Sequence, residues 1–122
     1  MQMIYVMAGG SIGALLRYII QSSLNSVWWG FPLGTFVANI VGSFVIGLLF
    51  PLVGSAPEWL RPFAITGFLG AFTTMSSYSL EVVTLVTEKR YTAATLHWAG
   101  GALLCVIFCA LGVWASNRFI AN

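Results

Sequence analysis

The residues of this chain that could do chemistry gather at positions 66–79, which read TGFLGAFTTMSSYS. Glycine weakens a helix interior, and hydroxyl groups can bond to backbone groups that a helix break sets free. A break would present N–H groups to an anion at one new helix end and carbonyl oxygens to a cation at the other. Alternatively, the hydroxyls bond back to their own helix. The segment's polar and small residues are Thr66, Gly67, Gly70, Thr73, Thr74, Ser76, Ser77 and Ser79.

A second polar signal is Asn39, within the run GTFVANIVGSFVIG at residues 34–47, which is otherwise apolar or small. A buried amide in a membrane needs a partner, so Asn39 faces either the other helices or a pore. Both roles remain open from the sequence. Its NH₂ group can donate to an anion, and Thr35, one turn earlier, shares its helix face.

Ionisable residues are scarce in the apolar stretches. We expect Arg17 to snorkel or to pair near a membrane edge, Glu81 to lie at a vestibule, and His97 to lie at headgroup level. The first stretch has no acidic residue, which argues against a proton-coupled exporter of similar size. No pair of carboxylates, metal-ligand cluster or activated serine is apparent, so the sequence does not indicate an enzyme.

Four long apolar stretches must position these residues. Only 7% of the 122 residues are charged, 59% are hydrophobic, and the mean hydropathy is +0.93. A soluble fold could not cover itself with so little polar surface. A membrane-spanning helix needs about 20 apolar residues, and residues 3–22, 33–53, 62–86 and 92–116 meet that requirement. The prediction is an all-α membrane protein with one domain over residues 1–122, four transmembrane helices and a broken third helix.

Small residues in these stretches are suited to close helix packing. Gly9 and Gly13 form a GxxxG pair, and Gly42 and Gly47 lie in the second stretch. The net charge of +2 is too small to indicate a nucleic-acid partner.

The charges of the loops leave the orientation in the membrane balanced. With four spans, Arg61 and Arg118 lie on one side, and Lys89, Arg90 and a snorkelling Arg17 lie on the other. Two basic residues against three give almost no bias under the positive-inside rule. The chain could therefore insert in both orientations and pair as an antiparallel dimer, or a partner subunit could supply the opposite orientation.

Three motifs resemble the Fluc (also called CrcB) fluoride channels of microbes. They are GGSIGALLRY at residues 9–18, GTFVANIVGSFVIG at 34–47 and TGFLGAFTTMSSYSLE at 66–81. The resemblance implies an antiparallel, dual-topology homodimer in the cell membrane. It also implies passive fluoride export that relieves fluoride toxicity.

The same resemblance implies roles for individual residues. Backbone carbonyls of Gly70 and Thr73 would bind a structural sodium ion at the dimer interface, and Arg17 and Glu81 would have vestibule or structural roles. The fluoride path would be formed by Thr35, Asn39, Thr74, Met75, Ser77 and Tyr78.

The chain departs from the family pattern at three positions. Met75 and Tyr78 stand where relatives usually carry two phenylalanines, and Gly101 stands where relatives have a serine that lines the path. These departures leave open a divergent homodimer, an engineered variant or one subunit of a heterodimeric channel. The remaining alternatives are a small dual-topology proton-coupled exporter and a membrane scaffold without selective flux.

Overall fold

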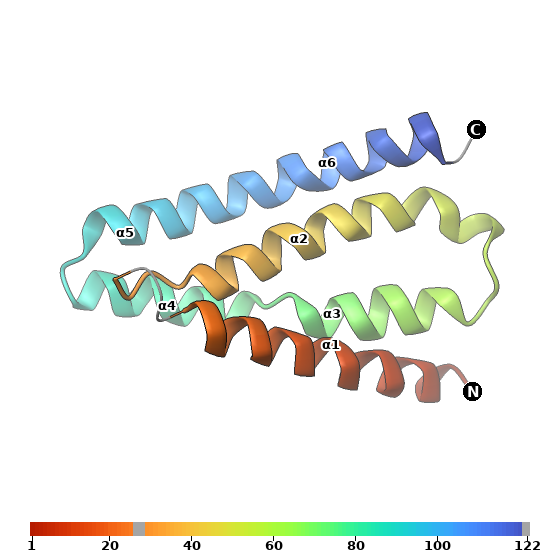
Figure 1. Cartoon of the computed structure of the whole chain (residues 1–122), viewed down its shortest axis with the longest axis horizontal. Coiled ribbons are helices and arrows are strands. Elements are labelled where there is room, and N and C mark those ends of the chain that lie inside the picture. Colours follow the sequence, from red (N-terminus) through yellow and green to blue (C-terminus); the bar gives the residue numbers. More distant parts are fainter. Residues whose placement is uncertain (26–28, 121–122) are drawn as a thin grey trace.

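Four helical rods lie side by side in the computed structural model, which describes residues 1–25 and 29–120 (Figure 1). The two chain ends lie at the same end of the bundle. The first rod is α1 (Gln2–Leu24), and the second is α2 (Leu33–Leu49) followed by η1 (Phe50–Ser55). The third rod consists of η2 (Arg61–Leu69), α3 (Gly70–Phe72) and α4 (Met75–Thr87). The fourth consists of α5 (Tyr91–Thr95), η3 (Leu96–Gly100) and α6 (Gly101–Phe119).

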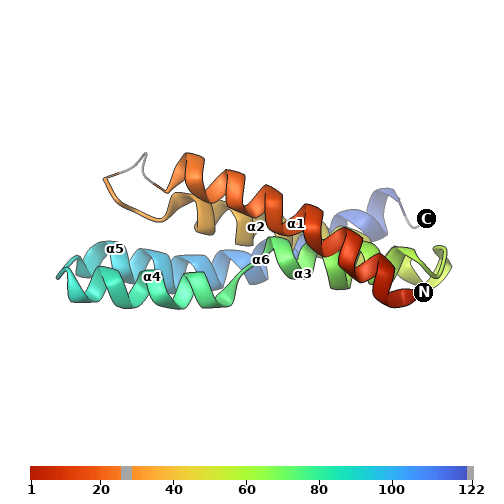
Figure 2. The same cartoon turned by 90° about the horizontal axis from the view of Figure 1, so that it is seen from below.

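The prediction of an all-α fold with a broken third helix is confirmed in the part of the chain that the structure describes. Three rods, Gln2–Leu24, Leu33–Ser55 and Tyr91–Phe119, are long and apolar enough to cross a membrane. The third rod is divided, and neither of its pieces reaches that length alone. Figure 2 shows the extended stretch of chain between α3 and α4.

Glycines allow the rods to approach until their backbones touch. A Cβ atom at Gly9 or Gly13 of α1 would overlap carbonyl oxygens of η2, and one at Gly67 would lie 2.5 Å from the Val6 carbonyl oxygen. Gly47 of α2 and Gly112 of α6 form a second contact of this kind. The predicted packing role of Gly9, Gly13 and Gly47 is therefore confirmed, and only glycine fits at these positions.

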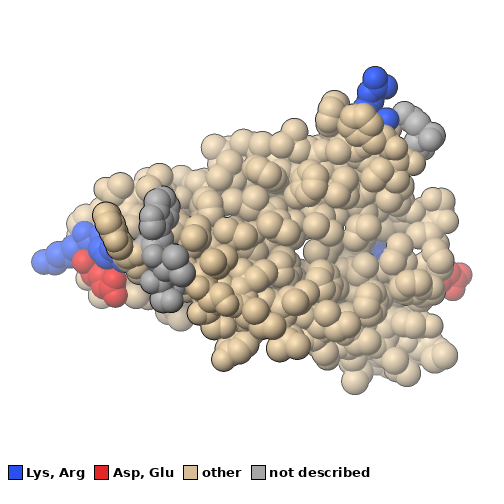
Figure 3. Space-filling model, viewed as in Figure 1, with Lys and Arg blue, Asp and Glu red and all other residues tan. Residues whose placement is uncertain are grey.

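The surface between the two ends of the bundle carries almost no charge. Figure 3 shows the basic and acidic side chains near the two ends of the visible face, with uncharged residues between them. Large apolar side chains such as Leu15, Leu103 and Val106 are exposed along the rods. A surface of this kind is stable against lipid but not against water. The chain is therefore a membrane protein.

Candidate ion path at the interrupted third helix

The third rod is interrupted at two residues with extended backbone. Thr73 has φ −82° and ψ 155°, and Thr74 has φ −149° and ψ 121°. Beyond them α4 begins at Met75, and the Thr74 hydroxyl caps the new helix by accepting the Ser77 N–H at 3.2 Å. A hydroxyl at this position is the usual N-cap of a helix. The threonine pair therefore ends one half-helix and begins the next.

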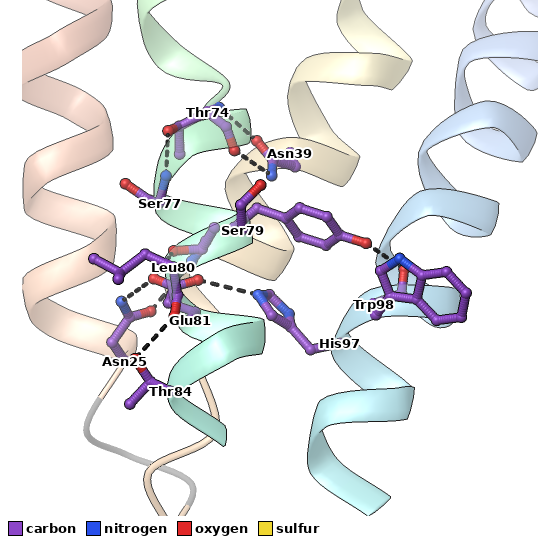
Figure 4. Close-up of polar contacts among 12 residues, drawn as sticks. Asn25, Asn39, Thr74, Ser77, Ser79, Leu80, Glu81, Thr84, His97 and Trp98 are labelled. Atoms are coloured by element: carbon purple, nitrogen blue, oxygen red, sulfur yellow. Dashed lines mark hydrogen bonds and ion pairs between the residues drawn. The ribbon is translucent and has the colours of Figure 1, made fainter. Parts of the chain in front are cut away.

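Asn39 of α2 holds the interrupted backbone in place. Its Oδ1 accepts the Thr74 N–H at 2.8 Å, and its Nδ2 donates to the Thr74 carbonyl at 3.1 Å. The two backbone groups fix which way the amide points, because one is a donor and the other an acceptor. Figure 4 shows Asn39 facing Thr74 across the two helices. One hydrogen of the NH₂ group remains for another acceptor, so the structural contact leaves room for a role in the path.

The same bonds free two carbonyl groups. In a continuous helix the Thr74 N–H would donate to Gly70 and the Ser77 N–H to Thr73. Here these N–H groups are directed at Asn39 and at the Thr74 hydroxyl. The carbonyls of Gly70 and Thr73 therefore lose their regular helical donors, and Gly70 is exposed.

These two carbonyls fit the sodium ion that the family resemblance implies. Unwound backbone carbonyls at the C-terminal ends of half-helices are ligands that sodium accepts in membrane proteins. Among residues 1–25 and 29–120, no group of three or more His, Cys, Asp or Glu side chains could hold a metal. Backbone oxygens at the interruption are donors of the kind that a monovalent cation accepts.

Arg17 contacts the third rod beside the interruption. Its Nε donates to the Ala71 carbonyl at 2.8 Å, so the expectation that it snorkels outward is not met. Ala71 belongs to the last turn of α3, where carbonyls without helical donors and the negative end of the helix dipole attract a cation. Arg17 thus has a structural contact with the broken helix.

An open groove of about 510 Å³ runs along the interruption. Of the residues predicted to bind ions, six line it: Asn39, Gly70, Thr73, Thr74, Met75 and Tyr78. The remaining predicted residues, Arg17, Thr35, Ser77 and Glu81, lie outside its lining. Met75 is 74% exposed, so this groove is open at the surface of a single chain.

Glu81 is surrounded by donors from three other segments. Its Oε1 accepts the Thr35 hydroxyl at 2.6 Å and Nδ2 of Asn25 at 3.4 Å, while Oε2 lies 3.0 Å from Nε2 of His97. The hydroxyl of Thr35 also accepts from Gln21 at 2.9 Å. Thr35 is completely buried in this network and does not share the groove with Asn39. Figure 4 shows Glu81 between Asn25 and His97.

His97 lies inside the protein, whereas the sequence suggested only its level near the headgroups. Its side chain has no exposed surface and packs between the rings of Phe31, Phe36 and Tyr78. Spacing along the chain could not reveal the pairing with Glu81, because the two residues are on different rods. Gln21 and Asn25 were missed as well, although polar residues four apart share one helix face.

The departures from the family pattern at Tyr78 and Gly101 are spatially linked. A Cβ atom at Gly101 would lie 3.1 Å from Cε2 of Tyr78, so the glycine makes room for the larger ring. The Tyr78 hydroxyl donates to the Trp98 carbonyl. Trp98 belongs to the π-helical segment η3, a distortion that is often found at functional sites.

Comparison with known proteins identifies the family. The family model described as CrcB-like protein, Camphor Resistance (CrcB), matches residues 4–113. A relative from Magnetococcus marinus is 42% identical over 118 residues, which are 93% of this chain and 95% of the relative. A relative from Burkholderia lata is 40% identical over 124 residues, covering 95% of this chain and 93% of the relative. Both relatives are named fluoride-specific ion channel FluC.

The matched region reaches into all four rods and includes the interruption at Thr73 and Thr74. The likeness therefore covers the part of the chain that forms the candidate path as well as the helices that support it. The chain belongs to the CrcB family.

Proposed function

We propose that this protein is a fluoride channel that lets fluoride leave the cell passively and so relieves fluoride toxicity. The observation that carries the proposal is the family match, since relatives named fluoride-specific ion channels align with the whole interrupted helix and its supports. The protein is a channel and not an enzyme. Its proposed location is the cell membrane, which the chain crosses several times.

The proposed fluoride path follows the groove beside the interruption. The N-terminus of α4 brings the positive end of a helix dipole there, which favours an anion. Asn39 retains one N–H for an acceptor, and the ring edge of Tyr78 carries partial positive charge. Met75 adds a soft apolar wall. Thr74 supports the path through its backbone, whereas Ser77 and Thr35 act from behind the groove.

An antiparallel, dual-topology homodimer is the proposed assembly. The groove is open on a single chain, and a second copy would close it. Carbonyls of Gly70 and Thr73 from each copy would hold the sodium ion. When bound, the ion supplies positive charge that offsets the exposed carbonyl oxygens of the broken helices.

The alternatives make different demands on the residues. A proton-coupled exporter needs a carboxylate that is free to exchange protons, whereas Glu81 is already bonded to Thr35 and His97. A heterodimeric channel would place the usual phenylalanines and serine on a second chain. A scaffold would need no path at all.

Purified protein in liposomes tests the proposal. With fluoride loaded inside and a potassium ionophore to balance charge, we expect fluoride efflux on a fluoride electrode and almost no chloride efflux on a chloride electrode. Well-inserted protein that releases no fluoride would refute the homomeric channel. Efflux that requires an imposed proton gradient would favour the exporter, and efflux only with a second subunit would favour the heterodimer.

A further inference from the structure

The pair of Glu81, which is 21% exposed, and the buried His97 lies beside the proposed path without belonging to its lining. Tyr78 connects the two regions, because its side chain lines the groove while its ring centroid lies 5.0 Å from that of His97. Tyr78 and Glu81 are three residues apart on α4 and therefore share a face of that helix. Glu81 therefore lies about one helical turn along α4 from Tyr78, the groove residue nearest to it in the chain.

An uncompensated carboxylate at this place would oppose an anion. Repulsion between like charges is weak in water but strong where protein and lipid exclude water. Three donors, from Asn25, Thr35 and His97, bond to the Glu81 carboxylate and offset its negative charge. Of these, only His97 can carry a positive charge, and no other charged side chain is within bonding distance of the carboxylate in the described part of the chain.

In the described part of the chain, the His97 ring makes one polar contact. A carboxylate can only accept, so Nε2 carries the hydrogen of the 3.0 Å bond to Glu81. The other ring nitrogen, Nδ1, is buried with no partner in the described part of the chain. On its remaining sides the ring meets Phe31, Phe36 and Tyr78. Burying a histidine in this way is costly unless its single polar bond is needed.

We infer that His97 is a positioning residue of the ion path, which holds the Glu81 carboxylate and masks its negative charge from fluoride passing Tyr78. The inference rests on the proposed fluoride channel function. In this specificity role, His97 keeps the Glu81 carboxylate bonded within the protein. The carboxylate then no longer acts as a barrier to anions.

Charge rescue in liposomes tests this role. His97→Phe keeps an aromatic ring among its aromatic neighbours but removes the donor to the Glu81 carboxylate. We expect its initial fluoride efflux rate to fall about tenfold in the Glu81 background, through repulsion in a medium of low dielectric constant. In the Glu81→Gln background the same change is expected to have little effect, because no charge remains to be masked.

His97→Gln is the matched variant, since its amide can still donate to Glu81, and we expect its rate to lie between those of the native protein and His97→Phe. All variants are compared at equal insertion, with helix content checked by circular dichroism. If His97→Phe loses flux equally in both backgrounds, or conducts like the native protein, the inference is wrong. If the native protein itself conducts no fluoride, the proposed function fails instead.

A double-mutant cycle on stability provides a readout that does not depend on flux. Thermal unfolding in detergent should show that His97→Phe destabilises the native background more than the Glu81→Gln background, because only the former is left with a part-buried carboxylate that has lost its histidine donor. Equal destabilisation in both backgrounds would contradict the masking of a charge, even where a variant is too unstable to reconstitute.

Discussion

At the scale of single residues, one asparagine holds the interruption by bonding to both backbone groups of Thr74. The Thr74 N–H has no helical acceptor at the break, and a buried N–H at membrane depth needs another partner. The Thr74 carbonyl is the N-cap carbonyl of α4, which can also accept the first bond of that helix. Asn39 meets both groups at once, at 2.8 Å and 3.1 Å. A carboxylate could accept the N–H but could not donate to the carbonyl, which explains why an amide is suited to this position.

Asn39→Ala is therefore expected to lower the free energy of unfolding. The Thr74 N–H left buried without a partner costs about 1–3 kcal/mol, and the bond from Asn39 to the Thr74 carbonyl is lost as well, so the loss should exceed that of an ordinary polar contact. Denaturant unfolding in detergent measures it. Ser43→Ala is the control, because the Ser43 hydroxyl donates to the Asn39 carbonyl of its own helix, at 2.7 Å, and not to the interruption.

Two further outcomes separate the roles of Asn39. Unchanged stability of Asn39→Ala would contradict its support of the break. Unchanged fluoride efflux at reduced stability would remove it from the path while leaving its structural role intact.

At the scale of elements, the rods were predictable and their mutual contacts were not. Apolar length alone located the four helical rods, three of which are long enough to span a membrane, and glycines with hydroxyls located the break in the third rod, because both are local properties of the chain. The contact of Arg17 with Ala71 joins residues 54 apart, and that of Thr35 with Glu81 joins residues 46 apart. Which helix faces meet depends on packing of the whole bundle, so the position of Arg17 and the burial of His97 could not be derived from spacing.

The contact between α1 and η2 predicts opposite effects for two neighbouring glycines. A Cβ at Gly13 would overlap the Phe68 carbonyl, whereas one at Gly10 would lie 3.8 Å from the Gly67 carbonyl oxygen. Gly13→Ala should therefore cost about 1–3 kcal/mol through overpacking. Gly10→Ala should be neutral or stabilising by up to about 1 kcal/mol, since alanine is the better helix former.

Thermal unfolding of the two variants in the same detergent makes the comparison. The pair controls for the general effect of removing a glycine from α1. Equal melting temperatures for Gly13→Ala and Gly10→Ala would show that α1 and η2 are not in the close contact that the structure has.

At the scale of the whole molecule, the position of Arg17 changes the balance of charges that sets orientation. Because its guanidinium is bonded to Ala71, it no longer counts with the loops. Arg61 and Arg118 at the end that carries both termini then face Lys89 and Arg90 at the other end, two against two. An equal count gives no preferred orientation under the positive-inside rule, which supports the proposed insertion in both directions.

Removing the basic residues from one end of the bundle should abolish protection against fluoride. Expressing two variants that lack opposite pairs of basic residues should restore it. Lys89→Gln with Arg90→Gln leaves basic residues only at the end with the termini, so this variant is expected to insert with its termini inside the cell. Arg61→Gln with Arg118→Gln is its mirror image. C-terminal reporters active on one or the other side of the membrane should both respond to the native chain and only one to each variant.

Because an antiparallel dimer needs both orientations, each variant alone should fail to protect fluoride-sensitive cells, whereas the two expressed together should protect them. Protection by either variant alone, with its orientation fixed by the reporters, would show that the channel does not require antiparallel partners.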